Sequence, residues 1–155
     1  MNFNKKISAV IVFSVGFFIL DRTLKQLFLD FLRTDSWEFL SGWFSLGFYK
    51  NYGIAFGLLL PQPLIIGLSA LILVFIAWLI IGTLVKNKLM LALALIFILI
   101  GAISNLCDRI FYGFVIDYFN FSGLTVFNLA DCLISLGVLI LLLNYLLCYN
   151  KEKID

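Results

Sequence analysis

Residues 64–106 read LIIGLSALILVFIAWLIIGTLV-KNK-LMLALALIFILIGAISNL, and this stretch decides the fold. It holds two long apolar segments, residues 64–85 and about 89–106, separated only by Lys86, Asn87 and Lys88. A helix needs about 20 apolar residues to cross the hydrocarbon core of a bilayer, at about 1.5 Å per residue. The stretch therefore predicts two antiparallel membrane-spanning helices joined by a short basic link.

Two further segments have the same apolar character, residues 7–28 before this stretch and residues 129–147 after it. Of the 155 residues in the chain, 63% are hydrophobic and 13% are charged, and the mean hydropathy is +1.10. Soluble domains are about 45–50% apolar and about 25% charged. We therefore predict a single integral membrane domain, residues 1–155, built as an all-α bundle of four transmembrane helices.

The basic residues predict how the helices are oriented. Six of the eleven Lys and Arg residues lie before the first helix, in the 86–88 link or after the fourth helix. Cytoplasmic loops carry an excess of Lys and Arg. We therefore expect both termini in the cytoplasm (N-in/C-in) and residues 30–63 and 110–127 outside. The N-terminus is basic and then apolar, but no small-residue cleavage site follows, so we expect an uncleaved first helix.

The two outer segments are rich in aromatic residues, which favour the headgroup region of a bilayer. Residues 44–48 alternate partly like a strand, and Asn51-Tyr52-Gly53 is a turn signal. We expect a small extracytoplasmic β-element in the first segment and a short outer loop or helix in the second. Both segments are expected to lie on the bilayer surface.

Residue types that are absent or scarce exclude several chemistries. The chain has no histidine, which removes Ser-His-Asp and Cys-His catalysis and every histidine-ligated metal site. Cys107, Cys132 and Cys148 are odd in number and lack a CxxC spacing, so neither a disulfide framework nor a zinc site is indicated. The net charge of +2 is too small to indicate nucleic-acid binding. We expect no cofactor and no metal.

Polar residues mark the outer end of the third apolar segment, although an ionised side chain inside a bilayer costs about 2.5–3.5 kcal/mol. Asn105 and Asp108 lie there, where the helix dipole disfavours an anion. Asp108 therefore needs a cation, and Arg109 is adjacent in the sequence. We expect an Asp108–Arg109 ion pair that anchors the helix end, with support of an active site as the alternative.

Two other polar residues have simple structural interpretations. Asp21 lies late in the first apolar segment, near the predicted outer surface, and pairing with Arg22, Lys25 or Arg109 would explain it. Asn51, taken alone, is an ordinary turn residue. Both interpretations leave open a role in a shared polar site on the outer side.

The start of the fourth apolar segment admits two interpretations. Asn128 fits a helix N-cap, and Asp131 stands three residues later, as the acidic partner of a capping box does. Capping does not explain Asp117, which lies among bulky apolar residues in the same outer segment. Two close carboxylates that share one proton can act as base and acid toward a water and a carbonyl. We therefore interpret Asp117 and Asp131 as a candidate acid–base pair at the membrane surface.

At these residues the chain resembles the bacterial lipoprotein signal peptidases (signal peptidase II, prolipoprotein signal peptidase), an aspartic peptidase family. Five segments carry the resemblance in sequence order: Asp21-x-x-x-Lys25, Asn51-Tyr52-Gly53-Ile54-Ala55-Phe56-Gly57, Gly101-x-x-x-Asn105-x-x-Asp108-Arg109, Val115-Ile116-Asp117-Tyr118 and Phe127-Asn128-x-Ala130-Asp131. Together on a four-span frame they are specific, whereas any one alone is not. The chain departs from the usual pattern in its short 117–131 segment, at Tyr118, where Phe is usual, and at Cys132, where Ser is common.

The resemblance implies an intramembrane aspartic endopeptidase. It implies removal of the signal peptide from diacylglyceryl-modified prolipoproteins, on the amino side of the lipidated cysteine, at the outer side of the bacterial plasma membrane. It implies a catalytic dyad of Asp117 and Asp131. The supporting or substrate-binding positions that it implies are Asp21, Asn51, Gly53, Asn105, Asp108, Arg109 and Asn128. The expected partners are prolipoproteins, membrane lipids and globomycin-type inhibitors, and we expect a monomer.

Two other classes of membrane protein are considered. A small ion or proton transporter could use Asp21, Asp108 and Asp131 as a relay. Relay acids usually lie near the membrane midplane, whereas these residues are predicted at the outer helix ends. A structural membrane subunit could bind a partner through its aromatic loops, but this class leaves the Asp-containing motifs unexplained.

Overall fold

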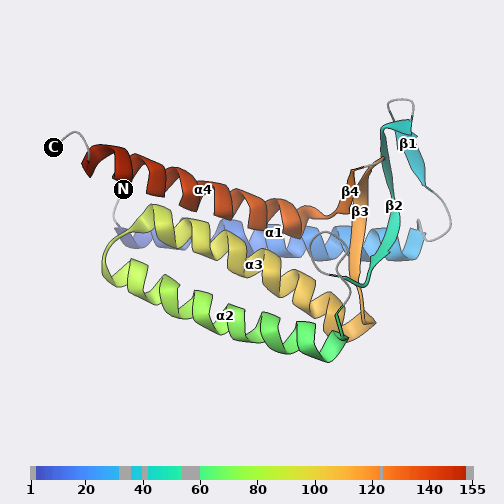
Figure 1. Ribbon diagram of the computed structural model, residues 1–155, viewed down its shortest axis with the longest axis horizontal. Coiled ribbons are helices and arrows are strands. Elements are labelled where there is room, and N and C mark those ends of the chain that lie inside the picture. Colours follow the sequence, from blue (N-terminus) through green and yellow to red (C-terminus); the bar gives the residue numbers. More distant parts are fainter. Residues whose placement is uncertain (1–2, 32–35, 40–41, 54–59, 123, 153–155) are drawn as a thin grey trace.

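The computed structural model describes residues 3–31, 36–39, 42–53, 60–122 and 124–152. Four long helices form the body: α1 (Phe3–Phe31), α2 (Gln62–Val85), α3 (Leu89–Tyr112) and α4 (Leu129–Glu152). All four are long and apolar enough to cross a membrane. Figure 1 shows a small sheet at one end of the bundle, while α1 begins and α4 ends at the opposite end. The predicted four-helix membrane architecture with a small β-element is confirmed.

Helix α3 continues past its apolar part, which the sequence places at residues 89–106. It includes Asp108 and Arg109 and ends at Tyr112, before Gly113, which adopts the left-handed conformation with φ of 77°. The amide of Gly113 donates to the carbonyl of Arg109. The uninterrupted apolar run ends near residue 106, but the backbone stays helical to Tyr112, and the side chains of Asp108 and Arg109 in this last part bind other parts of the protein.

The link between α2 and α3 turns the chain tightly at Lys86, Asn87 and Lys88. Asn87 has a positive φ of 54°, a conformation that asparagine tolerates better than most residues. The amides of Asn87 and Lys88 donate to carbonyls in the last turn of α2, at 3.0 and 2.8 Å. These bonds satisfy the helix end and fold α3 back antiparallel to α2, as the sequence predicts.

Helices α3 and α4 pack closely because glycines stand where they meet. A Cβ atom on Gly137 would lie 2.5 Å from the Ala94 carbonyl oxygen and 2.6 Å from Ile98 Cγ1. A Cβ on Gly101 would likewise collide with the Ala130 carbonyl oxygen. Small residues allow helix backbones to approach in membranes, where the hydrophobic effect does not drive association between helices. The close approach sets the C-terminal part of α3 against the start of α4.

The sheet contains four antiparallel strands in the order β1 (Trp37–Phe39), β2 (Phe44–Asn51), β3 (Val115–Phe121) and β4 (Thr125–Phe127). Strand β2 pairs with β3 although α2 and α3 separate them in sequence (Figure 1). The predicted strand around residues 44–48 is confirmed within β2. The ladder between β2 and β3 is irregular between Leu46 and Tyr49.

The second aromatic-rich segment, residues 110–127, contains strands β3 and β4 after the end of α3, where a short loop or helix was expected. Val115, Ile116, Asp117 and Tyr118 are all buried, so this part of β3 shows none of the alternation that marks a half-exposed strand. A short continuous apolar run has no diagnostic period, which explains why the sequence did not predict it. Asp117 is therefore held on a paired strand.

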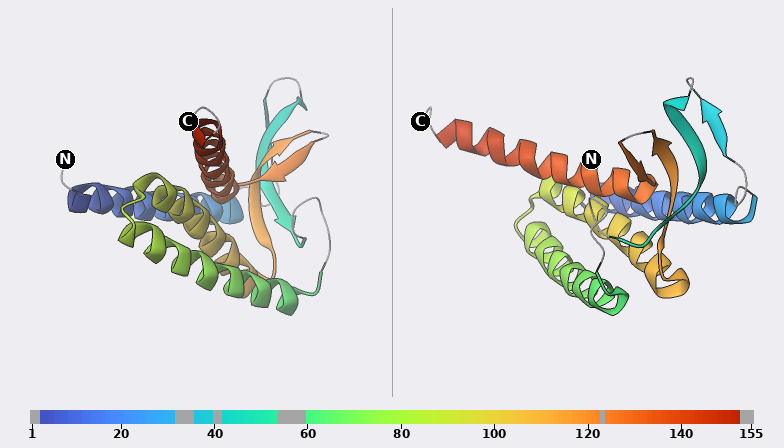
Figure 2. Two further views of the ribbon diagram at one scale, coloured as in Figure 1. Left: turned by 60° about the vertical axis from the view of Figure 1, so that its left-hand side comes forward. Right: turned by 45° about the vertical axis from the view of Figure 1, so that its right-hand side comes forward.

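The sheet rests on the C-terminal end of α1. The ring of Tyr118 stacks on Phe28, with centroids 4.8 Å apart and planes 1° from parallel. Leu24, Leu46 and Leu129 pack around this pair. The two views in Figure 2 show α1 passing beside the strands at the same end where α4 begins. This cluster joins α1, β3 and the start of α4 into one unit.

The close packing of α3 on α4 predicts that Gly137→Ala lowers stability by about 1–3 kcal/mol, the usual cost of overpacking. Thermal unfolding of the purified protein in detergent measures the change. Gly82→Ala in α2 is the matched control, because a Cβ there meets nothing within 4 Å. We expect the control to be neutral or slightly stabilising, since alanine favours a helix more than glycine does. Equal melting temperatures for the two variants would contradict this packing argument.

Candidate active site

Asp117 occupies a buried position on strand β3. Its side chain is fully buried and accepts two hydrogen bonds from carboxamides. Asn51 Nδ2 donates at 3.0 Å from the end of β2, and Asn128 Nδ2 donates at 2.6 Å from the residue before α4. The carboxyl group is thus oriented by groups from two elements that are distant in sequence.

Asp131 lies in the first turn of α4. Asn105 Nδ2 on α3 donates to it at 2.8 Å, and the backbone amide of Asn128 donates at 3.1 Å. In return, Asn128 Oδ1 accepts from the backbone amide of Asp131 at 2.9 Å. These reciprocal bonds form the capping box that the sequence suggests.

Asn128 joins the two carboxylates. Its backbone amide and side-chain oxygen hold Asp131, while its side-chain nitrogen holds Asp117. The same nitrogen also lies 3.2 Å from Asn105 Oδ1. The cap at the start of α4 is thus compatible with a pair of neighbouring carboxylates, because one fully buried asparagine binds both Asp131 and Asp117.

The electrostatics of Asp117 favour its protonated form. Burial raises the pKa of Asp117 to about 6, and the charge of nearby Asp131 adds to the increase. The hydrogen bonds from Asn51 and Asn128 act in the opposite direction, as does the charge of Lys25. A carboxyl group with this pKa can hold or release a proton near neutral pH, which general acid–base chemistry requires.

A cluster of buried charges lies beneath the pair. Lys25 Nζ, fully buried on α1, lies 2.7 Å from Asp108 Oδ2, 3.2 Å from Asp21 Oδ2 and 2.8 Å from Asn105 Oδ1. An ammonium group has three N–H donors, so Lys25 is fully satisfied. Asp21 also accepts from Ser104 Oγ at 2.5 Å. The cluster ties α1 to α3 just where α3 supplies Asn105.

The expected Asp108–Arg109 ion pair is wrong. Asp108 binds Arg22 and Lys25 of α1, and its Oδ2 also accepts from the Ile116 amide at 3.1 Å. Consecutive residues on an α-helix point about 100° apart, so neighbours in sequence do not face each other. The prediction paired Asp108 with Arg109 because they are adjacent in sequence, but the geometry of the helix decides which cation Asp108 can reach. For Asp21, three cations were considered as partners, Arg22, Lys25 and Arg109, and the structure pairs it with Lys25.

Arg109 points instead toward the loop that follows β2. Its Nη2 donates to the carbonyl of Gly53 at 3.1 Å, and its Nη1 donates to the carbonyl of Asn105 at 3.4 Å. The buried Nε has no hydrogen-bond partner within the described parts of the chain. Asn51 Oδ1 accepts from the Gly53 amide at 3.1 Å, which confirms the expected turn. The rest of this motif, residues 54–57, lies outside the described residues.

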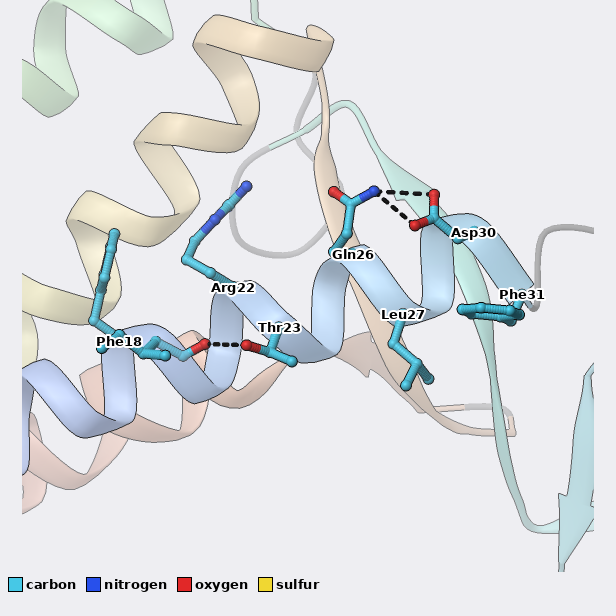
Figure 3. Close-up of a pocket in the computed structure, with 8 residues that line it drawn as sticks. Phe18, Arg22, Thr23, Gln26, Leu27, Asp30 and Phe31 are labelled. Carbon is cyan, nitrogen blue, oxygen red and sulfur yellow. Dashed lines mark hydrogen bonds between the residues drawn. The ribbon is translucent and has the colours of Figure 1, made fainter.

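A shallow hollow of about 500 Å³ lies along one face of α1 and is lined by residues of that helix, with neither Asp117 nor Asp131 among them. Figure 3 shows its lining residues along one helix. Gln26 donates to both carboxylate oxygens of Asp30, and Thr23 donates to the Ile19 carbonyl. Arg22 leaves this face to reach Asp108 and the Ser104 carbonyl on α3. The polar groups of the hollow are thus bound within the protein.

Three residues of the site and its surroundings were not among the predicted site residues. Lys25 stands four residues after Asp21, a spacing that places both on one helix face and could have marked it. Ser104 and Tyr118 both donate to Asp21. No sequence signal indicates these two contacts, because each depends on how α1 packs against other elements.

Known proteins of one family are similar to this chain. A family model described as signal peptidase (SPase) II matches residues 13–147. The chain is 40% identical over 136 residues to a protein named lipoprotein signal peptidase from Syntrophomonas wolfei subsp. wolfei, covering 87% of this chain and 91% of that protein. It is 38% identical over 128 residues to a protein of the same name from Syntrophus aciditrophicus, covering 77% and 79%.

Solved structures show the same fold. A bacterial membrane enzyme structure matches with a TM-score of 0.77 and 23% sequence identity, covering 90% of this chain and 88% of that chain. A second bacterial membrane enzyme structure matches with a TM-score of 0.74, also at 23% identity. These similarities establish the shared fold of a multi-pass membrane protein.

The buried charge cluster predicts that Lys25→Met destabilises the protein by about 3–5 kcal/mol, because it removes the cation that pairs with buried Asp21 and leaves Asp108 with Arg22 alone among the described residues. Thermal unfolding in detergent measures the loss. Lys88→Met is the matched control, since Lys88 is exposed in the link between α2 and α3. The charge change is the same in both variants. A Lys25→Met protein as stable as the control would contradict the argument.

The electrostatics of the pair predict that the Asp117 carboxyl group titrates near pH 6. Because the folded state holds this proton more tightly than the unfolded chain, stability falls as pH rises from 3.8 to about 6. Carbon-13 NMR of labelled aspartate in detergent measures the titration. In Asp131→Asn, we expect a lower pKa for Asp117 that stays above 3.8, because burial is the larger cause. An unchanged titration would contradict the coupling.

Proposed function

This chain belongs to the signal peptidase II family, and from that premise we propose that it is an aspartic endopeptidase with Asp117 and Asp131 as its catalytic dyad. Its substrates are diacylglyceryl-modified prolipoproteins, and it removes the signal peptide on the amino side of the lipidated cysteine. The observation that carries the proposal is the meeting of two carboxyl groups at one asparagine, Asn128: Asp117 is fully buried and Asp131 is partly buried.

The environments of the two carboxyl groups suggest how they divide the chemistry. Asp131 lies in the first turn of α4, where the helix dipole stabilises an anion. Burial raises the pKa of Asp117 to about 6, so this group holds a proton more readily than an ordinary aspartate. One carboxylate removes a proton from a water molecule, and the other gives a proton to the scissile carbonyl or the leaving amine. The pair thus combines one carboxyl group whose anion is stabilised with one that takes up a proton more readily than usual.

The supporting residues hold this pair in place. Asn51, Asn105 and Asn128 donate hydrogen bonds to the two carboxylates, so each group is oriented before substrate arrives. Arg109 donates to the carbonyl of Gly53 and so holds the turn that follows Asn51. Pre-organised donors of this kind lower the reorganisation needed in the transition state.

The substrate is expected to approach from the membrane. Its acyl chains stay in lipid beside the helices, while its peptide lies under the segment of residues 37–56, which contains strands β1 and β2 and of which residues 40–41 and 54–56 lie outside the described residues. We propose the bacterial inner membrane as the location, with both termini in the cytoplasm and the carboxylates facing the extracytoplasmic side. We further propose a monomer that globomycin inhibits.

The contacts of the acidic residues do not favour the transporter alternative. Asp21 and Asp108 are held by ion pairs with α1 cations, and Asp131 is held in a helix cap. A relay needs acids that exchange protons with one another along a path, whereas these groups are each bound in place. Peptide hydrolysis is therefore the function that the geometry supports best.

The dyad predicts that Asp117→Asn and Asp131→Asn each reduce cleavage at least about a hundredfold, the usual contribution of a general acid or base. The measurement is release of the signal peptide from a diacylglyceryl-modified prolipoprotein by purified protein in detergent, with and without globomycin. Asp30→Asn is the matched control, because Asp30 is exposed and binds Gln26 of the same helix. We expect wild-type activity from the control.

Near-normal cleavage by either dyad variant would remove the dyad assignment. No cleavage by folded wild-type protein would remove the peptidase proposal for this chain. Thermal unfolding of each variant accompanies the assay, so that loss of activity is separated from loss of fold.

A further inference from the structure

The hydroxyl of Tyr118 lies where three elements meet. It donates to Asp21 Oδ1 on α1 at 3.1 Å and accepts from the backbone amide of Leu129 at 2.9 Å. Tyr118 itself is on β3, directly after Asp117, and its side chain is fully buried. One oxygen atom therefore connects the strand that carries Asp117 with the helix that carries Asp131.

The start of α4 obtains its hydrogen-bond partners from elsewhere in the fold. The first amides of a helix have no partners within the helix. Here the Leu129 amide donates to the Tyr118 hydroxyl, and the Ala130 amide donates to Asp21 Oδ1 at 3.1 Å. Only the next amide, that of Asp131, uses the local cap on Asn128. The position of α4 along its own axis is thus set by a strand and by another helix.

We propose that Tyr118 is a positioning residue for the catalytic pair: its hydroxyl fixes the start of α4, and with it Asp131, relative to strand β3 and Asp117. This inference rests on the proposed function, because it assumes that the two carboxylates act together. Within the described structure, the Tyr118 hydroxyl is hydrogen-bonded to Asp21 and to the Leu129 amide, and not to Asp117 or Asp131. Its effect on Asp117 and Asp131 is therefore transmitted through the backbone.

The hydroxyl and the ring of Tyr118 have separable roles. The ring stacks on Phe28 and contributes packing that phenylalanine would preserve. The hydroxyl supplies both a donor and an acceptor, and burial together with nearby Asp21 raises the pKa of Tyr118, so the donor keeps its proton. Removing the oxygen leaves the Leu129 amide without its partner and removes one of the two bonds to Asp21 Oδ1. The helix start then gains freedom to move relative to β3.

Loss of the Tyr118 hydroxyl should lower the catalytic rate, whereas loss of packing alone should not. Misplacing a catalytic group by about 1 Å can cost about a hundredfold in rate. An interaction that matters only in the transition state lowers kcat and kcat/KM equally and leaves KM unchanged. A residue that only packs the sheet on α1 would lower the melting temperature and leave kcat of the folded protein intact.

The test compares wild type, Asp131→Asn, Tyr118→Phe and Tyr49→Phe in the detergent cleavage assay, at a temperature where all are folded. Tyr49→Phe is the matched control: it removes the same atom from a partly buried tyrosine whose hydroxyl binds Ser45 and Asn120 within the sheet. For Tyr118→Phe we expect kcat to fall about tenfold with KM unchanged. For Tyr49→Phe we expect both parameters within about twofold of wild type.

Hydrogen exchange gives a readout that does not depend on catalysis. In Tyr118→Phe the amides of Leu129 and Ala130 should exchange at least about tenfold faster than in wild type, because their tertiary partners are lost or loosened. In Tyr49→Phe their exchange should be unchanged. Faster exchange together with a lower kcat supports the proposal.

The outcomes separate this inference from the proposed function. Failure of wild type to cleave, or activity in Asp131→Asn, overturns the proposed function and with it the catalytic part of this inference. If wild type cleaves and Asp131→Asn does not, wild-type kcat in Tyr118→Phe overturns the positioning role alone. Equal losses of kcat in Tyr118→Phe and Tyr49→Phe also overturn it, because the effect then belongs to the sheet as a whole.

Discussion

The structure depends on the requirement that a charge removed from water must be paired. Lys25 meets this requirement with Asp21, Asp108 and the side-chain oxygen of Asn105, using all three of its N–H donors. Each of these bonds reaches a group that also holds another element. Asp21 binds the start of α4, and Asp108 binds the backbone of β3. An unpaired charge at this depth would cost several kcal/mol, so the elements are held in one arrangement.

The same requirement explains why the candidate site is rigid. Asn105 accepts from Lys25 with its oxygen and donates to Asp131 with its nitrogen, so the charge cluster and the paired carboxylates share a residue. The close packing of α3 on α4 at Gly101 sets the distance across which this asparagine reaches. A loose helix pair would leave buried polar atoms unsatisfied. The packing of α3 on α4 and the orientation of the carboxylates therefore depend on each other.

Several features of the site follow from local sequence rules, and others do not. The capping box of Asn128 and Asp131 and the turn at Asn51 depend on residues a few positions apart, and both are present as predicted. The Asp108–Arg109 pair was predicted from adjacency and is wrong, because helix geometry turns neighbours away from each other. Strand β3 was not predicted, because its first residues are buried on both faces and show no period of two.

The sequence by itself determined the four spans, the tight link at residues 86–88 and the identities of the polar residues at one end of the bundle. These depend on apolar length and local spacing, which any stretch of chain carries within itself. Only the tertiary structure decided which cation pairs with Asp108, that Asn128 joins Asp117 to Asp131, and that the Tyr118 hydroxyl reaches both Asp21 and the start of α4. Those contacts join residues that are far apart in the chain, and they form because buried polar groups must find partners after the helices have packed.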